Sequence, residues 1–367
     1  MKISAAVLRR AGHALELEEL ELEPPRGDEV LVRLQASGIC RSDLSLADGK
    51  WPAPLPMVLG HEGAGTIEEV GEGVDPDLVG RHVVLTFTPG CGRCRFCLQG
   101  RVNLCTEAAR CMDAGVLPDG TTRLSRNGER VHHLALVSSF ATHAVVPANA
   151  AIPVPAGLDP AVSCLLGCGV LTGVAAVTRR ANVRPGESVA VLACGGVGLA
   201  AVLGARLVSA HPVVVVDPVG VKRELALQLG ATHAIDPEAE DPVAAIRAIV
   251  PDGVDHAFEA AGIPAVAEQA VAATRTGGTT VLIGQPALGA SVSLPVYELT
   301  QFEHDVLGTH IGGATPALDV PALAALAGAG KLLLAPLVTH RYRLERIGEA
   351  LETARSGTAG RVVLDLD

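Results

Sequence analysis

The chain has 367 residues, of which 49% are hydrophobic and only 2% aromatic, and its formal net charge is -11. This length exceeds what one hydrophobic core usually holds, so we expect two domains whose cores consist of Val, Leu, Ile and Ala. The negative charge argues against nucleic acid and anionic membranes as partners, because both are bound by basic surfaces.

Residues 1–155 are expected to form a strand-rich domain. Apolar and polar residues alternate along Val30–Gln35 and more loosely along Ala64–Val70, and glycine-containing turns separate such segments. Residues 106–135 have the least regular pattern in the chain, so they are expected to form a long surface loop.

Four cysteines lie close together within this first part of the chain. No apolar segment near Met1 resembles a signal peptide, so we expect a cytoplasmic protein, in which closely spaced cysteines bind metal more often than they form disulfides. Four thiolates fill the tetrahedral shell of zinc and leave no open position, which predicts a structural zinc site. An iron–sulfur cluster and four unrelated core cysteines are the alternatives, although the ferredoxin continuation x3-Cys-Pro is missing. The four residues are Cys91, Cys94, Cys97 and Cys105.

After Pro155 short apolar runs alternate with segments of helical pattern. Such alternation predicts a doubly wound parallel sheet with right-handed crossovers. Two of the helical segments are Lys222–Leu229 and Val243–Ile249. The expected strands are Ser188–Ala193, Val213–Val216, Asp255–Glu259 and Thr279–Ile283.

The end of the chain returns to strand-like segments, with a helix expected over Leu344–Arg355. These segments are expected to rejoin the first domain, so that the domain with the parallel sheet is an insertion. The predicted boundaries are 1–169 for the first domain with its cysteine lobe near 90–106, 170–308 for the inserted domain, and 309–367 for the return.

A glycine-rich loop follows the first strand of the predicted parallel sheet. Glycines there let the backbone approach a pyrophosphate and let the next helix, whose first N–H groups are free, pack closely on the strand. Ala193 occupies the usual position of the first glycine, so we expect a slightly different turn. The loop residues expected to bind the cofactor are Gly195, Gly196, Val197 and Gly198.

Asp217 ends the next predicted strand. A carboxylate at this position accepts both ribose hydroxyls of NAD and repels the 2′-phosphate of NADP, which favours NAD. The alternative is that Asp217 is an ordinary turn residue at a strand end.

Three further motifs stand in a fixed order with the cysteine cluster and the glycine loop. They are Gly38-Ile39-Cys40-Arg41-Ser42-Asp43, Gly60-His61-Glu62-Gly63 and Gly167-Cys168-Gly169 with Thr172-Gly173. With these motifs the chain resembles the zinc-containing medium-chain alcohol dehydrogenases over essentially its whole length. The resemblance is greatest to the subgroup with an extended loop around Asp119-Gly120-Thr121.

The resemblance implies a Rossmann coenzyme domain inserted in a mostly-β, GroES-like catalytic domain. It also implies two zinc ions per chain and reversible hydride transfer between a primary or secondary alcohol and NAD. The expected assembly is a homodimer that pairs strands late in the coenzyme domain, either Thr279–Ile283 or Val292–Val296.

The resemblance assigns the catalytic zinc to Cys40, His61 and Cys168, with water or a substrate oxygen as fourth ligand. Two thiolates and one imidazole also fit the known Cys2His open site. Asp43 is then the carboxylate that fixes the tautomer of His61, and Glu62 lies behind the zinc as a transient ligand.

The remaining catalytic and substrate positions are also implied by the resemblance. Ser42 matches the hydroxyl that hydrogen-bonds the substrate oxygen. Ser45 stands where better-studied members carry a histidine that passes the proton to solvent, so the proton is expected to leave through Ser42, the ribose hydroxyls and water. Phe87 and Trp51 match residues that line the alcohol channel.

Several other residues match contacts to the cofactor. Arg41 and Arg361 match pyrophosphate contacts, and Thr172 and Val197 match residues packed on the nicotinamide. Lys222 matches a contact to the adenosine ribose, although a solvated helix lysine is its alternative role. Ile283, at the end of a predicted strand, is a further expected contact.

Related activities define what else the chain could do. Glutathione-linked formaldehyde-oxidising members carry a carboxylate where Trp51 stands and an arginine where Ala109 stands, so that activity is not expected. A nicotinoprotein that retains NAD and a non-catalytic protein that binds zinc and a dinucleotide remain as alternatives. Three cysteines without a ligand role are expected to be packing residues: Cys111, Cys164 and Cys194.

Overall fold

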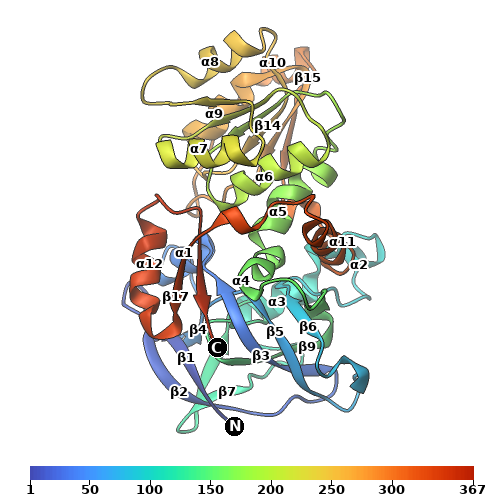
Figure 1. The fold of residues 1–367 in the computed structure, drawn as a ribbon, viewed down its shortest axis with the longest axis vertical. Helices are drawn as coiled ribbons and strands as arrows, with labels where there is room; N and C mark the ends of the chain where they lie inside the picture. Colours follow the sequence, from blue (N-terminus) through green and yellow to red (C-terminus); the bar gives the residue numbers. More distant parts are fainter. The chain divides into compact units, whose positions relative to one another are not determined.

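A computed structural model describes all residues of the chain, Met1–Asp367. Its backbone contacts divide the chain into two units (Figure 1). Unit 1 comprises Met1–Cys168, Thr315–Ser356 and Arg361–Asp367, and unit 2 comprises Gly169–Ala314 with Gly357–Gly360. The chain therefore leaves unit 1, builds unit 2 and returns, as predicted for an inserted domain.

The return to unit 1 falls at Ala314 rather than at the predicted residue 308. The turn Ile311–Gly313 packs on helix α5 (Gly169–Ala175) of unit 2. The packing is so close that a side-chain carbon at Gly312 would lie 2.4 Å from the main-chain oxygen of Thr172.

Unit 1 contains a seven-stranded sheet and a small closed barrel. The sheet runs in the order β10-β6-β5-β3-β18-β17, and β9 also pairs with β3. The sheet strands are β3 (Glu29–Gly38), β5 (Glu62–Val70), β6 (His82–Leu85), β9 (His143–Pro147), β10 (Ala151–Pro153), β17 (Val338–Arg343) and β18 (Arg361–Asp365). The barrel strands are β1 (Lys2–Leu8), β2 (Glu16–Leu22), β4 (Met57–Val58), β7 (Leu124–Arg126) and β8 (Glu129–His133).

The central strand β3 brings distant parts of unit 1 together. It pairs antiparallel with β5, so that Gly38 lies opposite Glu62, and on its other side it pairs antiparallel with β18 near the C-terminus. The helices of unit 1 are α1 (Arg41–Ala47), α2 (Arg95–Leu98), α3 (Thr106–Ala114), α4 (Pro160–Ser163), α11 (Pro316–Gly328) and α12 (Ile347–Arg355).

The prediction of a long surface loop over residues 106–135 is wrong. The segment contains helix α3, which ends at Gly115 in the left-handed conformation, and the hairpin of β7 and β8. Its apolar side chains enter the barrel core, because Cys111, Leu117 and Val131 belong to one buried cluster. The polar residues that hid this pattern include Arg123, which is buried against Glu29.

Unit 2 is a parallel six-stranded sheet in the order β13-β12-β11-β14-β15-β16. This order confirms the predicted doubly wound Rossmann fold. The strands are β11 (Val189–Leu192), β12 (Val213–Val216), β13 (His233–Ile235), β14 (Val254–Glu259), β15 (Thr274–Leu282) and β16 (Asp305–Gly308). Besides α5, the helices are α6 (Gly196–Leu207), α7 (Gly220–Leu229), α8 (Pro242–Ile249), α9 (Pro264–Ala273) and α10 (Val296–Gln301).

Neither segment predicted to pair between two chains presents a free strand edge. Thr279–Ile283 falls mostly in β15, which is hydrogen-bonded to β14 on one side and β16 on the other. Val292–Val296 is not a strand, and Val296 begins α10. The free edge at this end of the sheet is β16.

No single helix is long and apolar enough to cross a membrane. One bent pair, Pro160–Gly167 with Gly169–Arg180, meets the test of length and composition only when its two members are taken together, and most of its residues are buried.

Candidate active site

Four side chains from three segments of unit 1 meet beside the start of α1. They are Cys40, His61, Glu62 and Cys168, and the atoms that could ligate a metal all lie within 4.8 Å of one another. The first precedes α1, the next two stand at the start of β5, and the last follows a helical turn over Cys164–Gly167. The structure thus brings together the three predicted ligands of the catalytic zinc, with Glu62 beside them.

The fully buried carboxylate of Asp43 connects two of these segments. One oxygen accepts hydrogen bonds from Nδ1 of His61 at 3.1 Å and from the main-chain N–H of Gly60 at 3.2 Å. The other accepts from the N–H of Cys40 at 2.9 Å. Because a carboxylate only accepts, Nδ1 of His61 carries the proton and Nε2 is left to face the other ligands.

Asp43→Asn is expected to lower kcat/KM or zinc affinity by about 10- to 100-fold, the usual cost of losing a partner of a metal-bound histidine. The amide nitrogen of Asn is a donor, so it cannot accept the hydrogen bond that an N–H group of Cys40, Gly60 or His61 now donates to the carboxylate. Zinc analysis and steady-state kinetics would measure the effect. Asp48→Asn is the matched control, because Asp48 follows the same helix but pairs with Arg355 at the surface. Equal effects of the two substitutions would contradict the role of Asp43.

The pKa shifts of these side chains favour the binding of a cation. The hydrogen bond with Cys168 lowers the pKa of Cys40 well below its usual value and raises the pKa of Cys168 well above it. Burial by itself lowers the pKa of His61, but Asp43 and Cys40 raise it well above its usual value. A divalent metal competes with these protons for the same atoms, so metal binding here releases protons. Two thiolates and an imidazole are donors that zinc prefers.

Behind these ligands Glu62 forms a buried ion pair with Arg361, from β18. Burial raises the pKa of Glu62, whereas the guanidinium opposes that rise. Gly38 makes room for the carboxylate, since a side-chain carbon there would lie 2.2 Å from its Oε2. Arg361, which we expected to contact the cofactor, is 6% exposed and has its guanidinium on Glu62.

The other predicted residues of unit 1 differ in burial and in what they contact. Oγ of Ser42 lies 3.2 Å from Nε2 of His61, and the ring of Phe87 packs edge-on against the imidazole with centroids 5.3 Å apart. Ser45 is buried in α1, Trp51 is half-buried, and Arg41 is exposed at the first position of α1.

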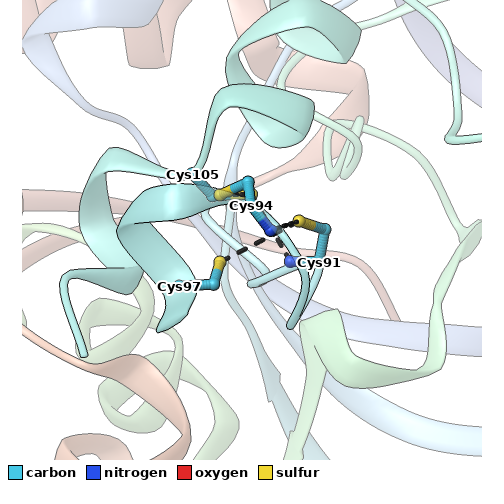
Figure 2. A group of neighbouring side chains, drawn as sticks. All are labelled: Cys91, Cys94, Cys97 and Cys105. Carbon is cyan, nitrogen blue, oxygen red and sulfur yellow. Dashed lines mark hydrogen bonds between the residues drawn. The ribbon is translucent and has the colours of Figure 1, made fainter. Parts of the chain in front are cut away.

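The four cysteines of the lobe form a second group of potential ligands. Figure 2 shows the thiols of Cys91, Cys94, Cys97 and Cys105 turned toward one another, and all four sulfur atoms lie within 4.8 Å. The pairs Cys91–Cys97 and Cys94–Cys105 are each 4.0 Å apart. Four thiolates about 2.3 Å from a zinc ion lie roughly 3.8 Å from one another, so the group fits a closed tetrahedral site.

In unit 2 the glycine loop joins β11 to α6. Helix α6 begins after Gly195, and no side chain caps its first N–H groups, which leaves them available to an anion. A side-chain carbon at Gly195 would meet no atom within 4 Å, whereas one at Gly198 would lie 1.8 Å from the oxygen of Ala193. The second glycine is therefore required for close packing, and the first leaves open space beside the helix start.

Ala193, at the usual position of the first glycine, has a φ of 84°, in the left-handed region that favours glycine. A non-glycine residue held there is strained by about 1–2 kcal/mol. The alanine thus occupies a conformation that suits the usual glycine.

Ala193→Gly is accordingly expected to raise the free energy of unfolding by up to about 1 kcal/mol, since relief of strain outweighs the greater chain entropy of glycine in the unfolded state. Denaturant unfolding of the two proteins would measure the difference. Ala205→Gly, within buried helix α6, should instead destabilise the protein. A loss of stability in Ala193→Gly would show that the left-handed conformation is not strained.

Asp217 stands at the carboxyl end of β12 and is 4% exposed. Its carboxylate accepts hydrogen bonds from the N–H of Cys194 at 2.7 Å and from the N–H of Val219 at 2.8 Å. It therefore lies directly beside the glycine loop. Each of its oxygens keeps a second lone pair for a ligand hydroxyl.

The remaining predicted cofactor residues also belong to unit 2. Thr172 is buried in α5, Val197 and Lys222 are half-buried in the first turns of α6 and α7, and Ile283 is buried just after β15. Glu259, which was not predicted as a site residue, is a buried carboxylate that ends β14 opposite Leu192 of β11. It accepts hydrogen bonds from three successive N–H groups, those of Ala261, Gly262 and Ile263. Its position at the carboxyl end of a predicted parallel strand could have identified it as a candidate site residue.

Comparison with known proteins gives consistent matches over the whole chain. The alcohol dehydrogenase GroES-like domain matches residues 26–156, and the zinc-binding dehydrogenase family matches residues 196–327. An NDMA-dependent alcohol dehydrogenase of Amycolatopsis methanolica is 41% identical, with 99% of each chain covered. An S-(hydroxymethyl)glutathione dehydrogenase of Synechocystis is 38% identical, with 99% of this chain and 100% of the relative covered. The crystal structure of benzyl alcohol dehydrogenase from Acinetobacter calcoaceticus superimposes with a TM-score of 0.95 at 36% identity, with 100% of each chain covered.

Proposed function

Because this chain belongs to the zinc-containing medium-chain alcohol dehydrogenases, we propose that Cys40, His61 and Cys168 hold its catalytic zinc and that its cofactor is NAD. The protein is an oxidoreductase that transfers a hydride between an alcohol and a nicotinamide cofactor, giving the aldehyde or ketone. The observation that carries the proposal is the convergence of two cysteine thiols with the His61 imidazole, whose Nδ1 is hydrogen-bonded to Asp43.

The residues of unit 1 would act on the alcohol as follows. Zinc on these ligands would supply Lewis acidity, which lowers the pKa of a bound alcohol. Ser42, whose hydroxyl is 3.2 Å from His61 Nε2, is placed to hydrogen-bond the alcohol oxygen and take its proton. Because Ser45 has replaced the histidine of other members, the proton would leave through Ser42, the ribose hydroxyls and water. Arg361 would hold Glu62 beside the ligands.

The choice of NAD over NADP rests on Asp217. Its buried carboxylate at the end of β12 would accept the ribose hydroxyls and repel a 2′-phosphate. The first N–H groups of α6 would bind the pyrophosphate. With the four-cysteine site, this gives two zinc ions per chain, one catalytic and one structural.

The substrate is proposed to be a primary or secondary alcohol that a half-buried Trp51 and the ring of Phe87 can enclose. One relative is named for benzyl alcohol, which fits an aromatic-lined site. Another is named for S-(hydroxymethyl)glutathione, but Trp51 and Ala109 stand where members with that activity carry a carboxylate and an arginine, so we expect no such activity.

A second candidate is a nicotinoprotein that keeps NAD bound and recycles it with a second substrate. The specific observation in its favour is the 41% identity to an alcohol dehydrogenase named as NDMA-dependent. Near-stoichiometric NAD in the purified protein would support this candidate, and NAD lost on gel filtration would support the ordinary dehydrogenase.

We also propose a cytoplasmic homodimer that meets along β16 and α10. Strand β16 is one free edge of the sheet, and large apolar side chains are exposed in the segment 288–302 that precedes it in the chain. These are Leu288, Val296, Tyr297 and Phe302. Sedimentation velocity should give a dimer, and Tyr297→Glu should give monomers.

The experiment that tests the proposed function is NADH formation, measured at 340 nm with zinc-analysed protein. Aliphatic, terpenoid and aromatic alcohols and S-(hydroxymethyl)glutathione would be compared, each with NAD and with NADP. We expect turnover of an alcohol with NAD and not with NADP. If no alcohol gives NADH and the purified protein also contains no NAD, both the ordinary dehydrogenase and the nicotinoprotein would be overturned.

A further inference from the structure

An ion pair between Arg223 and Asp236 lies at the adenosine end of the proposed cofactor site, close to Asp217. The guanidinium of Arg223, in the first turns of α7, donates a 2.6 Å hydrogen bond to the main-chain oxygen of Asp217. Its other nitrogen donates to Asp236, which follows β13, at 2.7 Å. A guanidinium is therefore fixed at the very strand end where the ribose hydroxyls would bind.

Arginine is the side chain that proteins use most often to bind a phosphate at this place, because its planar fork matches two phosphate oxygens. Here the fork is divided between a main-chain oxygen and a carboxylate. Both partners of the ion pair are largely shielded, with side-chain exposures of 21% for Arg223 and 31% for Asp236, so the contact is not a fully solvated surface pair.

We propose that Asp236 is a second determinant of the preference for NAD, because it withholds the Arg223 guanidinium from a 2′-phosphate. Asp217 repels that phosphate, and Asp236 removes the nearest arginine that could compensate. This inference rests on the proposed NAD specificity and extends it to a residue 19 positions further along the chain.

The surroundings of Arg223 support this division of roles. Burial raises the pKa of the Cys194 thiol, and the positive charges of Lys222 and Arg223 oppose that rise. The N–H of Cys194 donates to the carboxylate of Asp217. Arg223 contacts the main-chain oxygen of Asp217 and the carboxylate of Asp236, so Asp236 is its ion-pair partner. When the bond to Asp236 is broken, the bond to the main-chain oxygen of Asp217 still keeps the guanidinium at the strand end.

Asp236→Asn is the direct test. The substitution removes the charge but keeps Oδ1, which accepts a hydrogen bond from the N–H of Glu238 and so preserves the turn. Binding of adenosine 2′,5′-bisphosphate and of 5′-AMP to the full-length protein would be measured by titration calorimetry. These probes differ in the 2′-phosphate and need no turnover.

We expect Asp236→Asn to bind the bisphosphate at least about fivefold more tightly, with 5′-AMP affinity unchanged within twofold. The double variant Arg223→Gln/Asp236→Asn should lose the gain. Glu240→Gln removes an equal charge at an exposed position nearby and should change neither affinity. Melting temperatures of all variants would show that each is folded.

Two results would overturn the inference: an unchanged affinity for the bisphosphate in Asp236→Asn, or a gain that persists without Arg223. Failure of the proposed NAD preference is distinguishable, because the unaltered protein would then bind the bisphosphate as tightly as 5′-AMP. Asp217→Asn provides the reference, since it should strengthen bisphosphate binding whether or not Asp236 contributes to the preference.

Discussion

Replacing Cys40 with serine is expected to abolish alcohol oxidation, with kcat/KM falling by at least about 1,000-fold. The Lewis acidity of a catalytic zinc contributes several kcal/mol to the stabilisation of a transition state, and each 1.36 kcal/mol is a factor of ten in rate. Cys40 is one of only three protein ligands in the proposed site, and its thiolate is replaced by a hydroxyl. Zinc analysis should find a fall from about two to about one ion per chain.

Cys164→Ala is the matched control for this experiment. Cys164 is also a buried cysteine of unit 1, but it lies outside the group of potential ligands and donates only to the main-chain oxygen of Ala161. The control should keep two zinc ions and most of its activity, with a loss of stability of about 1–3 kcal/mol for the vacated volume. Cys40→Ser protein that keeps two zinc ions and more than a tenth of its activity would contradict the assignment.

Cys94→Ser is expected to lower the melting temperature by roughly 10 °C or more and to remove the other zinc ion. The lobe has little else to hold it, because α2 is only four residues long and the apolar side chain of Leu98 is 74% exposed. Binding of a structural zinc contributes directly to the free energy of folding. A loss of several kcal/mol in a chain of this size shifts the melting temperature by the expected amount.

Scanning calorimetry with zinc analysis would measure this effect. Backbone hydrogen bonds from Cys97 and Thr106 lower the pKa of Cys94 to about 5, so its thiolate is available to a metal at neutral pH. Cys111→Ala is the control, because this thiol is buried in the neighbouring helix α3 but is not one of the four. Equal shifts in the two variants would show that the lobe owes its stability to packing rather than to metal.

The parallel sheet of unit 2 could be predicted because its signals are local. The run of four valines in Val213–Val216 is a buried strand, and Gly198 has the tight contact with the preceding loop that the glycine pattern implies. Cys40, His61 and Cys168 were predicted as zinc ligands through motifs in the family's order. Their meeting within 4.8 Å is what the structure adds to that prediction.

Other features depend on pairings between distant segments. Glu62 and Arg361 are separated by 299 positions and meet because β3 pairs with both β5 and β18. The contact of Asp43 with the N–H of Gly60 likewise needs the fold. The segment 106–135 was misread because buried polar residues such as Arg123 interrupt its apolar pattern, and their partners lie elsewhere in the sequence.

We propose above that zinc held by Cys40, His61 and Cys168 activates an alcohol whose hydride passes directly to NAD. This proposal is tested most directly by a single turnover with benzyl alcohol carrying deuterium on its reacting carbon, in ordinary water, with protein containing either two zinc ions or one per chain. We expect NADH with one deuterium at C4 of the nicotinamide from the two-zinc protein, and no NADH from protein that keeps only the four-cysteine site. Labelled NADH formed equally by both preparations, or NADH without deuterium, would contradict it.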